Sequence, residues 1–211
     1  MVRTIDAEAR RKLLADAVWR LLRTGGLEAA SVRAVANEAG LSAGSVRHFF
    51  TTQDELHVFA MDELMRRTEE KVEAAMREAG EQRSGAAAPD WARGRVRAGL
   101  HQLLPIDEES TADFQTHLQF VVKAVIHPPL APTAQGSYQR MQEFYEHCID
   151  QLTHHGAADS DIDHRAAAQE LAVVVDGLVL RRLTAPEHVS VENMIGILDA
   201  HLAGLKTEER I

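Results

Sequence analysis

A stretch of twenty residues, SVRAVANEAGLSAGSVRHFF (31–50), constrains the fold of this chain more than any other. Ser31 is predicted to be a helix N-cap, because a serine hydroxyl accepts a hydrogen bond from an otherwise unpaired backbone N–H. Residues 32–39 form the helix that follows, and Gly40 ends it, since glycine adopts the left-handed conformation without steric cost. Ser42 caps a second helix. The pattern predicts two short helices joined by a tight turn.

The spacing of small and apolar residues around this turn is that of a helix-turn-helix. Ala36 lies four residues before Gly40, where two steeply crossing helices need a small side chain, and the predicted shared core is Val35, Ala39, Leu41, Val46 and Phe49. In this register six residues of the second helix project away from the core: Ser42, Ala43, Gly44, Ser45, Arg47 and His48. Such a helix lies in the DNA major groove with its N-terminal residues on base edges. An ordinary helical hairpin is the alternative, and the spacing favours DNA binding.

The division of charge along the chain supports a DNA-binding head. The whole chain has a formal net charge of −9, which is unfavourable for binding DNA. Residues 1–50, however, carry eight Lys and Arg against five Asp and Glu, whereas the other 161 residues carry 15 against 27. Because phosphate attracts only the basic part, we expect a small N-terminal head and a larger acidic body with another task. Arg3, Arg10 and Arg11 are candidate contacts to flanking phosphates or to the minor groove, with plain solubility as the alternative.

Apolar periodicity predicts an all-α protein of about nine helices, and no segment alternates as a strand would. Thr52 and Glu55 form a capping box that starts a long fourth helix, which ends near Ala79. The other helices are expected at about residues 6–24, 91–104, 110–127, 132–155, 161–183 and 190–205, with a loop at 80–89. We therefore expect a three-helix DNA-binding domain at residues 1–52 and a second, helical domain at residues 53–211.

The last two predicted helices have the apolar character of a dimer interface. LAVVVDGLVLRRL (171–183) is apolar on more than one face, as in a helix buried on both sides. Two such helices that meet their symmetry mates form a four-helix interface, for which the candidates are Leu171, Val175, Gly177, Leu178, Met194, Ile195, Leu198 and Leu202. The alternative is that both helices complete the core of a monomer. Asp176 is expected to be structural at the dimer seam, with contact to a cationic ligand as the alternative.

The predicted head resembles the DNA-binding domain of the TetR family of transcriptional regulators. The likeness lies above all in GLEAASVRAVANEAGLSAGSVRHFFTTQDEL (26–56), and VVVDGLVLRRL with the amphipathic helix after it is similar to members with a BetI-like C-terminal domain. The resemblance implies a homodimer on a palindromic operator, usually a repressor released by a small ligand in the helical body. Carried over to this chain, it implies DNA contacts from Ser31, Val32 and Arg33 in the second helix and from Ser42, Ala43, Gly44 and Ser45 in the third.

Three positions depart from the family's usual residues. Arg47 stands where the family usually has tyrosine, Phe49 where it often has His or Tyr, and Gln53 where it commonly has lysine. The family's tyrosine and lysine typically touch phosphates, so this chain needs that contact from Arg47, His48 or the helix N-terminus at Thr52. Arg47 suits either a phosphate or a bidentate contact to guanine, and we favour the phosphate.

The chain shows no pattern typical of catalysis or of a metal site. It has no glycine-rich phosphate loop, G-x-S-x-G motif or H-E-x-x-H motif. The densest histidine group, His154, His155 and His164, is more typical of solvated or helix-capping side chains, and the single cysteine, Cys148, of a small buried apolar one. No apolar run approaches the roughly 20 residues that span a bilayer, and the N-terminus lacks a signal-peptide core. We expect a cytoplasmic protein that is not an enzyme and holds no metal or cofactor.

The helices of the body offer an apolar pocket with a few hydrogen-bonding groups. The candidate ligand contacts are His101, Phe114, His117, Phe120, Tyr138, Gln142, Phe144 and His147, each of which core or surface packing also explains. The sequence thus predicts a dimeric repressor whose fourth helix moves when ligand binds and changes the spacing of two heads from the roughly 34–36 Å of one DNA turn. The alternatives are an activator or a ligand-independent regulator and, less favoured, a helical protein-interaction module.

Overall fold

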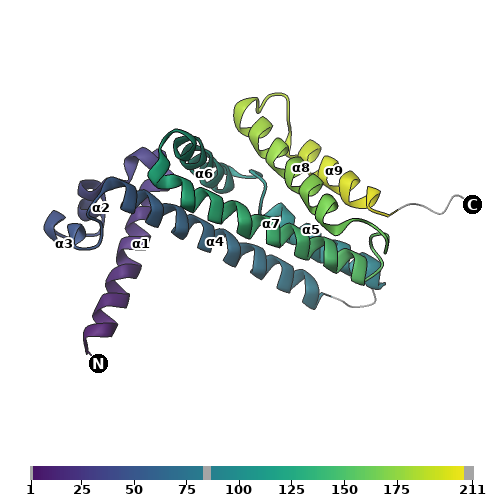
Figure 1. Cartoon of the computed structure of the whole chain (residues 1–211), viewed down its shortest axis with the longest axis horizontal. Coiled ribbons are helices and arrows are strands. Elements are labelled where there is room, and N and C mark those ends of the chain that lie inside the picture. Colours follow the sequence, from purple (N-terminus) through teal and green to yellow (C-terminus); the bar gives the residue numbers. More distant parts are fainter. Residues whose placement is uncertain (1, 83–86, 207–211) are drawn as a thin grey trace, which may run out of the picture. The chain divides into compact units, whose positions relative to one another are not determined.

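The computed structural model describes residues 2–82 and 87–206, with side chains from residue 9 onward. These residues form nine α-helices and one 3-10 turn and contain no strand (Figure 1), which confirms the predicted all-α class. The helices are α1 (Val2–Ala29), α2 (Val32–Glu38), α3 (Ala43–Arg47), α4 (Gln53–Glu81), α5 (Ala88–His101), α6 (Glu108–Ile126), α7 (Ala131–His154), α8 (His164–Thr184) and α9 (Val191–Gly204), and the 3-10 turn η1 spans Pro128–Leu130. Among the helices described, none is long and apolar enough to cross a membrane.

The chain folds as two compact units. The first unit comprises residues 1–67 and 112–136, and the second comprises residues 68–111 and 137–211. Helices α4, α6 and α7 therefore each contribute residues to both units. The units do not coincide with the predicted domains, residues 1–52 and 53–211, because much of α6 packs with the N-terminal helices. The domain boundary after residue 52 stays a prediction.

A kink at Gly26 sets the path of the chain between α1 and α2. The backbone of Gly26 has φ 66° and ψ −163°, a conformation that is essentially restricted to glycine. The predicted helix stop at Gly25 and Gly26 is thus confirmed as a break in helical geometry, although one more turn follows it, to Ala29. A Cβ on Gly26 would lie 2.5 Å from Oε1 of Gln119. Both the backbone angles and the close approach of α6 require glycine here.

A buried carboxylate joins α4 to α1 in the first unit. Glu63 is buried, and its Oε1 accepts hydrogen bonds from Nε of Arg67 at 2.5 Å and Nη2 of Arg66 at 2.7 Å. Arg67 also donates to Oδ1 of Asp16 at 2.7 Å, and its guanidinium lies 4.8 Å from the ring centroid of Trp19. Burial alone would raise the pKa of Glu63, but the hydrogen bonds from both arginines outweigh it and lower that pKa. The carboxylate therefore stays ionised and positions Arg67, and Arg67 joins α4 to α1 through Asp16 and Trp19.

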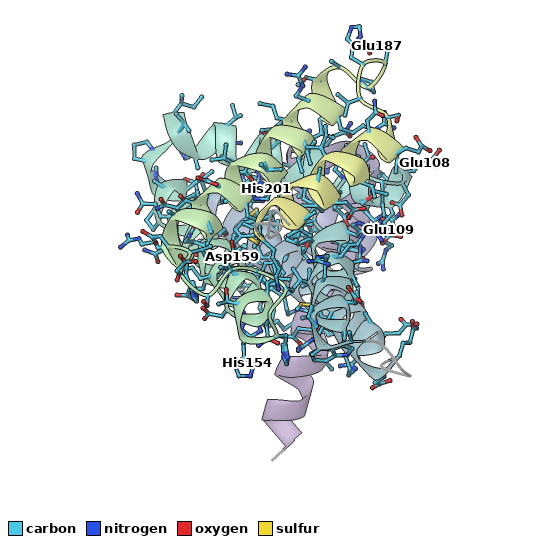
Figure 2. The ribbon with its side chains drawn as sticks, turned by 90° about the vertical axis from the view of Figure 1, so that its right-hand side faces the viewer. Glu108, Glu109, His154, Asp159, Glu187 and His201 are labelled. Atoms are coloured by element: carbon cyan, nitrogen blue, oxygen red, sulfur yellow. The ribbon has the colours of Figure 1, made fainter. Side chains whose placement is uncertain are left out.

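In the second unit α8 and α9 lie side by side in both views (Figures 1 and 2). Asp163 caps α8 by accepting from the backbone N–H of Ala166, and Ser190 caps α9 by accepting from that of Asn193. Figure 2 labels His201 on α9 and Asp159 in the connection before α8, where the Asp159 backbone N–H donates to the Leu205 carbonyl at 3.0 Å. Caps and this connection together fix where both helices begin and end.

Replacing Gly26 by alanine tests the kink. We expect Gly26→Ala to lower the free energy of unfolding by about 1–3 kcal/mol, because alanine is strained at this positive φ and its Cβ meets Gln119. Urea unfolding of the full chain measures the change. The matched control is Gly94→Ala in α5, where a Cβ has open space, so that stability should rise by up to about 1 kcal/mol. Equal effects of the two substitutions would contradict the kink's role.

Candidate nucleic-acid interface

Local hydrogen bonds define the two short helices α2 and α3. Oγ of Ser31 accepts from the Ala34 backbone N–H at 3.2 Å, and Oγ of Ser42 accepts from that of Ser45 at 3.1 Å, so both predicted N-caps are confirmed. Gly40 has φ 65°, and it ends α2 in a Schellman motif. In this motif the Leu41 N–H donates to the Ala36 carbonyl at 2.8 Å and the Gly40 N–H to the Asn37 carbonyl at 3.2 Å.

The shared core of the helix-turn-helix agrees only in part with the predicted one. Val35 and Val46 are buried as predicted, together with Ala36, whereas Ala39 and Leu41 are half-buried. Phe49, which the periodicity assigned to the core, is 39% exposed, whereas Phe50 is only 5% exposed and packs with its ring centroid 5.0 Å from that of Phe59 on α4. The prediction failed because α3 ends at Arg47: past that point the chain turns, and the helical spacing no longer decides which side chain points inward.

The predicted DNA-contacting residues lie on the surface of this motif. Arg33, Ser42, Ala43, Gly44, Arg47, His48 and Thr52 are exposed, and Ser31, Val32 and Ser45 are half-buried. Within the described part of the chain, Arg33, Arg47 and His48 make no hydrogen bond or ion pair. Arg20, by contrast, is paired with Glu38 at 2.5 Å. The arrangement leaves two guanidinium groups and one imidazole available to an external partner.

Arg10 and Arg11, two candidate phosphate contacts on α1, are partly in contact with the protein itself. The guanidinium of Arg11 lies 5.7 Å from the ring centroid of Phe59, so it packs against α4. Arg10 is half-buried. Arg3 falls among residues 2–8, whose side chains lie outside the described residues.

The N-terminus of α4 already holds a carboxylate. The predicted capping box is confirmed: the Glu55 N–H donates to Oγ1 of Thr52 at 3.1 Å, and Oε2 of Glu55 accepts from the N–H groups of Thr51 at 2.5 Å and Thr52 at 3.4 Å. These backbone hydrogen bonds lower the pKa of Glu55. Because Glu55 occupies these N–H groups, a phosphate contact from Thr52 has to use its hydroxyl.

Gln53 links α4 to the joint between α1 and α2. Its Nε2 donates to the Ala30 carbonyl at 2.5 Å and lies 2.9 Å from Nε2 of His57, which is fully buried. The side chain that replaces the family's common lysine is thus turned towards the protein. Nothing in the sequence pattern identified His57, and the replacement at Gln53 was the only signal for this pair.

Helix α6 contacts the same joint from the other side. Oε1 of Gln119 accepts from the Leu27 backbone N–H at 2.9 Å, next to the kink at Gly26. Two ion pairs flank this contact: Lys123 with Glu28 at 2.7 Å, and His127 with Asp54 at 2.9 Å. The hydrogen bond from Lys123 lowers the pKa of Glu28. Sequence reasoning missed this attachment, since it joins residues more than 70 positions apart.

The predicted ligand contacts fall into both units and differ in burial. Phe120 is a fully buried core residue, whereas Tyr138 is 63% exposed and His147 is also exposed. The other five are half-buried: Phe114 and His117 in the first unit, and His101, Gln142 and Phe144 in the second. Burial lowers the pKa of both His101 and His117. In the second unit, Nε2 of His101 and Oε1 of Gln142 are buried polar atoms without a hydrogen-bond partner.

Most of the predicted dimer residues belong to the core of the chain itself. Leu171, Val175, Leu178, Met194, Leu198 and Leu202 are buried, and only Gly177 and Ile195 of the eight are half-buried. Helices α8 and α9 thus bury their strongest apolar stripe within their own unit, and the assignment of these eight residues to a dimer interface stays a prediction. The large apolar side chains that remain exposed on these two helices are Val173, Leu180 and Ile197. Asp176 lies on the exposed side of α8, and partial burial raises the pKa of its carboxyl.

The groups that invited a metal or redox interpretation have other partners. Among the described residues no cluster of three or more His, Cys, Asp or Glu side chains could hold a metal ion. Nδ1 of His164 lies 2.6 Å from Oδ1 of Asp150, and the ring of His155 packs edge-on against Trp91. Cys148 is buried, which raises its thiol pKa to about 12. A thiol with this pKa is a small apolar side chain at neutral pH.

Two family models match the chain. Residues 14–58 match the model of bacterial regulatory proteins of the tetR family. Residues 92–206 match the model of the C-terminal part of BetI-type transcriptional repressors, which alone covers more than half of the chain.

Individual proteins and solved structures agree with these models. The chain is 28% identical to the HTH-type transcriptional regulator PksA of Bacillus subtilis (strain 168), over 99% of this chain and 96% of PksA. It is 29% identical to the HTH-type transcriptional regulator BetI of Stenotrophomonas maltophilia (strain R551-3), over 82% and 80% of the two chains. A transcriptional regulator from Rhodococcus sp. Rha1 superposes with a TM-score of 0.70 at 26% identity, over 92% of this chain and 95% of that one. A regulator from Saccharomonospora viridis in complex with choline has a TM-score of 0.72 at 20% identity, over the same shares, which shows the fold alone.

Removing the cap of α3 tests how this short helix is held. We expect Ser42→Ala to lower the free energy of unfolding by about 1 kcal/mol, because the Ser45 backbone N–H loses its acceptor. Thermal unfolding of the full chain measures the loss. Ser42→Thr is the control, since threonine keeps the capping hydroxyl. A threonine variant as unstable as the alanine variant would show that the cap is not the cause.

Proposed function

The chain belongs to the TetR family of transcriptional regulators, and from this premise we propose that it is a repressor released from DNA by a small molecule. Two copies of the chain bind a palindromic operator through their helix-turn-helix motifs. The small molecule binds in the helical body and changes the spacing of the two heads. The family consists of transcriptional regulators and not of enzymes, and the repressor role follows the description of the matching C-terminal model.

The observation that carries the proposal is the set of unpaired basic side chains on the helix-turn-helix. Arg33 on α2 and Arg47 at the end of α3 are exposed and unpaired among the described residues. We assign Arg33 to a base edge, because a guanidinium forms a bidentate pair with guanine. We assign Arg47 to a phosphate, in place of the family's usual tyrosine. His48 and the Thr52 hydroxyl add further polar contacts to the DNA backbone.

Helix α6 supports a route from ligand to head. It holds the joint between α1 and α2 through Gln119 and Lys123, and His127, the residue after its end, contacts the start of α4. Both α6 and α4 continue into the second unit. A ligand that shifts either helix along its length therefore moves the head without contacting the head itself.

The half-buried polar groups of the second unit are proposed to contact the ligand. His101 and Gln142 each carry a buried polar atom that lacks a partner, and such groups are normally satisfied. A small molecule that donates to Oε1 of Gln142, or one that pairs with the His101 ring, would satisfy the group that it reaches. Phe144, also half-buried, supplies apolar contact.

The exposed apolar residues of α8 and α9 are proposed to form the dimer interface. Val173 is 72% exposed, and Leu180 and Ile197 are about as exposed as they are buried. Gly177 and Gly196 on the same two helices have open space around their Cα atoms, which permits close approach of a second copy.

The proposal is tested by DNase footprinting of the full chain on the DNA upstream of its own gene. We expect a protected palindrome, and a regulated promoter whose transcription rises when the gene is deleted. Absence of any protected site would contradict DNA binding, and transcription that falls on deletion would contradict repression while leaving DNA binding intact.

Two arginine substitutions separate base contact from phosphate contact. Arg33→Ala is expected to weaken operator binding by about 1–3 kcal/mol and to relax sequence preference at one position. Arg47→Ala is expected to weaken binding evenly across sequences and to reduce the salt slope by about one. Titrations of operator variants at several salt concentrations measure both, with Arg165→Ala, an exposed arginine of α8, as the control. An unchanged salt slope for Arg47→Ala would refute the phosphate assignment.

A charge placed on the exposed face of α9 tests the dimer. We expect Ile197→Glu to convert the dimer into a monomer, because a buried unpaired carboxylate is costly. Light scattering on the eluting protein gives the molecular mass, and Val125→Glu is the matched control, since Val125 on α6 is 81% exposed and outside the proposed interface. A dimeric Ile197→Glu variant would overturn this choice of surface.

A further inference from the structure

We propose that His57 is a positioning residue for DNA binding. Its neutral ring holds the Gln53 side chain on the Ala30 carbonyl. Protonation of the ring in acid breaks this bridge and lowers the affinity for DNA. The inference rests on the proposed function in one respect, which is that DNA binding is the readout. The bridge itself is a feature of the first unit alone.

The orientation of the Gln53 amide is fixed by its partner. The Ala30 carbonyl oxygen can only accept, so the Gln53 atom that lies 2.5 Å from it must be the nitrogen. The same nitrogen lies 2.9 Å from Nε2 of His57. An amide nitrogen carries two hydrogens, and it therefore donates one to the carbonyl and one to the ring.

This arrangement assigns the protonation state of His57. Nε2 has to accept from Gln53, so the ring is neutral and its one proton lies on Nδ1. Nδ1 is buried and has no hydrogen-bond partner, and the whole residue is fully buried. A second proton on Nε2 would point an N–H at the N–H of Gln53. Rotating the amide does not relieve the conflict, because its oxygen would then face the Ala30 carbonyl.

Charged and titratable groups from three helices surround the ring. Glu28 lies on α1, Asp54 on α4, Lys123 on α6, and His127 directly after the end of α6. Both carboxylates already have cationic or histidine partners, in the pairs of Lys123 with Glu28 and of His127 with Asp54. Burial first, and then Lys123, lower the pKa of His57 below its ordinary value of 6.5, and the two carboxylates oppose this only in part.

The direction of the pH effect follows from this environment. The bridged state binds fewer protons at His57 than a state in which the ring is exposed to water. Acid therefore shifts the equilibrium away from the bridge, and the stabilisation is lost as the pH falls below about 6.5. A histidine that contacts phosphate strengthens DNA binding when it is protonated, so the expected effect of His57 is opposite to that of such a contact.

The Gln53 bridge ends at Ala30, the residue that precedes Ser31, the N-cap of α2. Ala30 is buried, and Ser31 next to it accepts the Ala34 N–H that starts α2. Arg33 lies in the first turn of this helix. Loss of the Gln53 bridge frees the joint between α1 and α2, and the base contact assigned to Arg33 loses its fixed position.

The test compares the acid dependence of DNA binding in the full-length wild type and in His57→Gln. The probe is a short duplex that the wild type selects from random-sequence DNA. Glutamine places an amide oxygen near the position of Nε2, where it accepts from Gln53 and does not titrate. Between about pH 7.5 and about pH 5.5, the dissociation constant of the wild type should rise about fivefold more than that of the variant. Every other side chain is the same in both proteins, so contributions from the rest of the chain cancel in this comparison.

Three further variants keep the test decisive. His57→Leu removes the acceptor and should bind about fivefold more weakly than His57→Gln near pH 7.5, which is rescue by the conservative variant. Gln53→Met removes the bridge from the other side and should also lose the additional acid dependence. His127→Gln should retain it. Circular dichroism at each pH confirms that every variant is folded, and the unfolding midpoint of His57→Gln should fall less in acid than that of the wild type.

The outcomes separate this inference from the proposed function. A His57→Gln variant that is folded and shows the wild-type acid dependence overturns the role of His57, as does an acid dependence that disappears in His127→Gln alone. If the wild type retains no duplex from the random pool, the proposed function is overturned, and the role of His57 in DNA binding with it. If His57→Gln fails to fold, the comparison of Gln53→Met with wild type decides.

Discussion

The hydrogen bond from the Leu27 backbone N–H to the Gln119 side chain is the contact on which the placement of α2 and α3 depends. At Gly26 the chain leaves helical geometry, and the N–H that follows is buried against α6. An unpaired buried N–H costs about as much free energy as a lost hydrogen bond. Gln119 accepts from the Leu27 N–H, so the kink does not carry this cost. The same amide excludes any side chain at position 26. A residue of the sixth helix thus decides the angle at which the chain enters the second.

The basic side chains of the first unit divide into two groups with different tasks. Arg20, Arg67 and Lys123 are each committed to a carboxylate, and Arg67 also stacks on an indole ring. Arg33 and Arg47 have no such partner among the described residues. The net charge of the head therefore overstates how much of it attracts phosphate.

The sequence predicted what depends on neighbouring residues and missed what depends on distant ones. Caps at Ser31 and Ser42, the left-handed Gly40 and the capping box of Thr52 and Glu55 all form within a few residues, so their residue types suffice. The exchange of Phe49 for Phe50 in the core follows from where α3 ends, which periodicity does not reveal. The apolar stripe of α8 and α9 was assigned to a second copy, because a pattern of buried residues does not say what buries them. The contacts of α6 with the head join segments up to 95 positions apart and have no local signal.

The length of α3 limits how much sequence a head of this kind can recognise. Its five residues rise about 7.5 Å along the helix axis, which matches roughly two base-pair steps of DNA. With one more position read by α2, the two heads of the proposed dimer would specify on the order of six base pairs, a combination that occurs by chance about once in 4,000. A bacterial chromosome would then contain on the order of a thousand full matches by chance, far more than one regulator controls. Discrimination among them has to come from the spacing of half-sites and from the stiffness of the DNA between them.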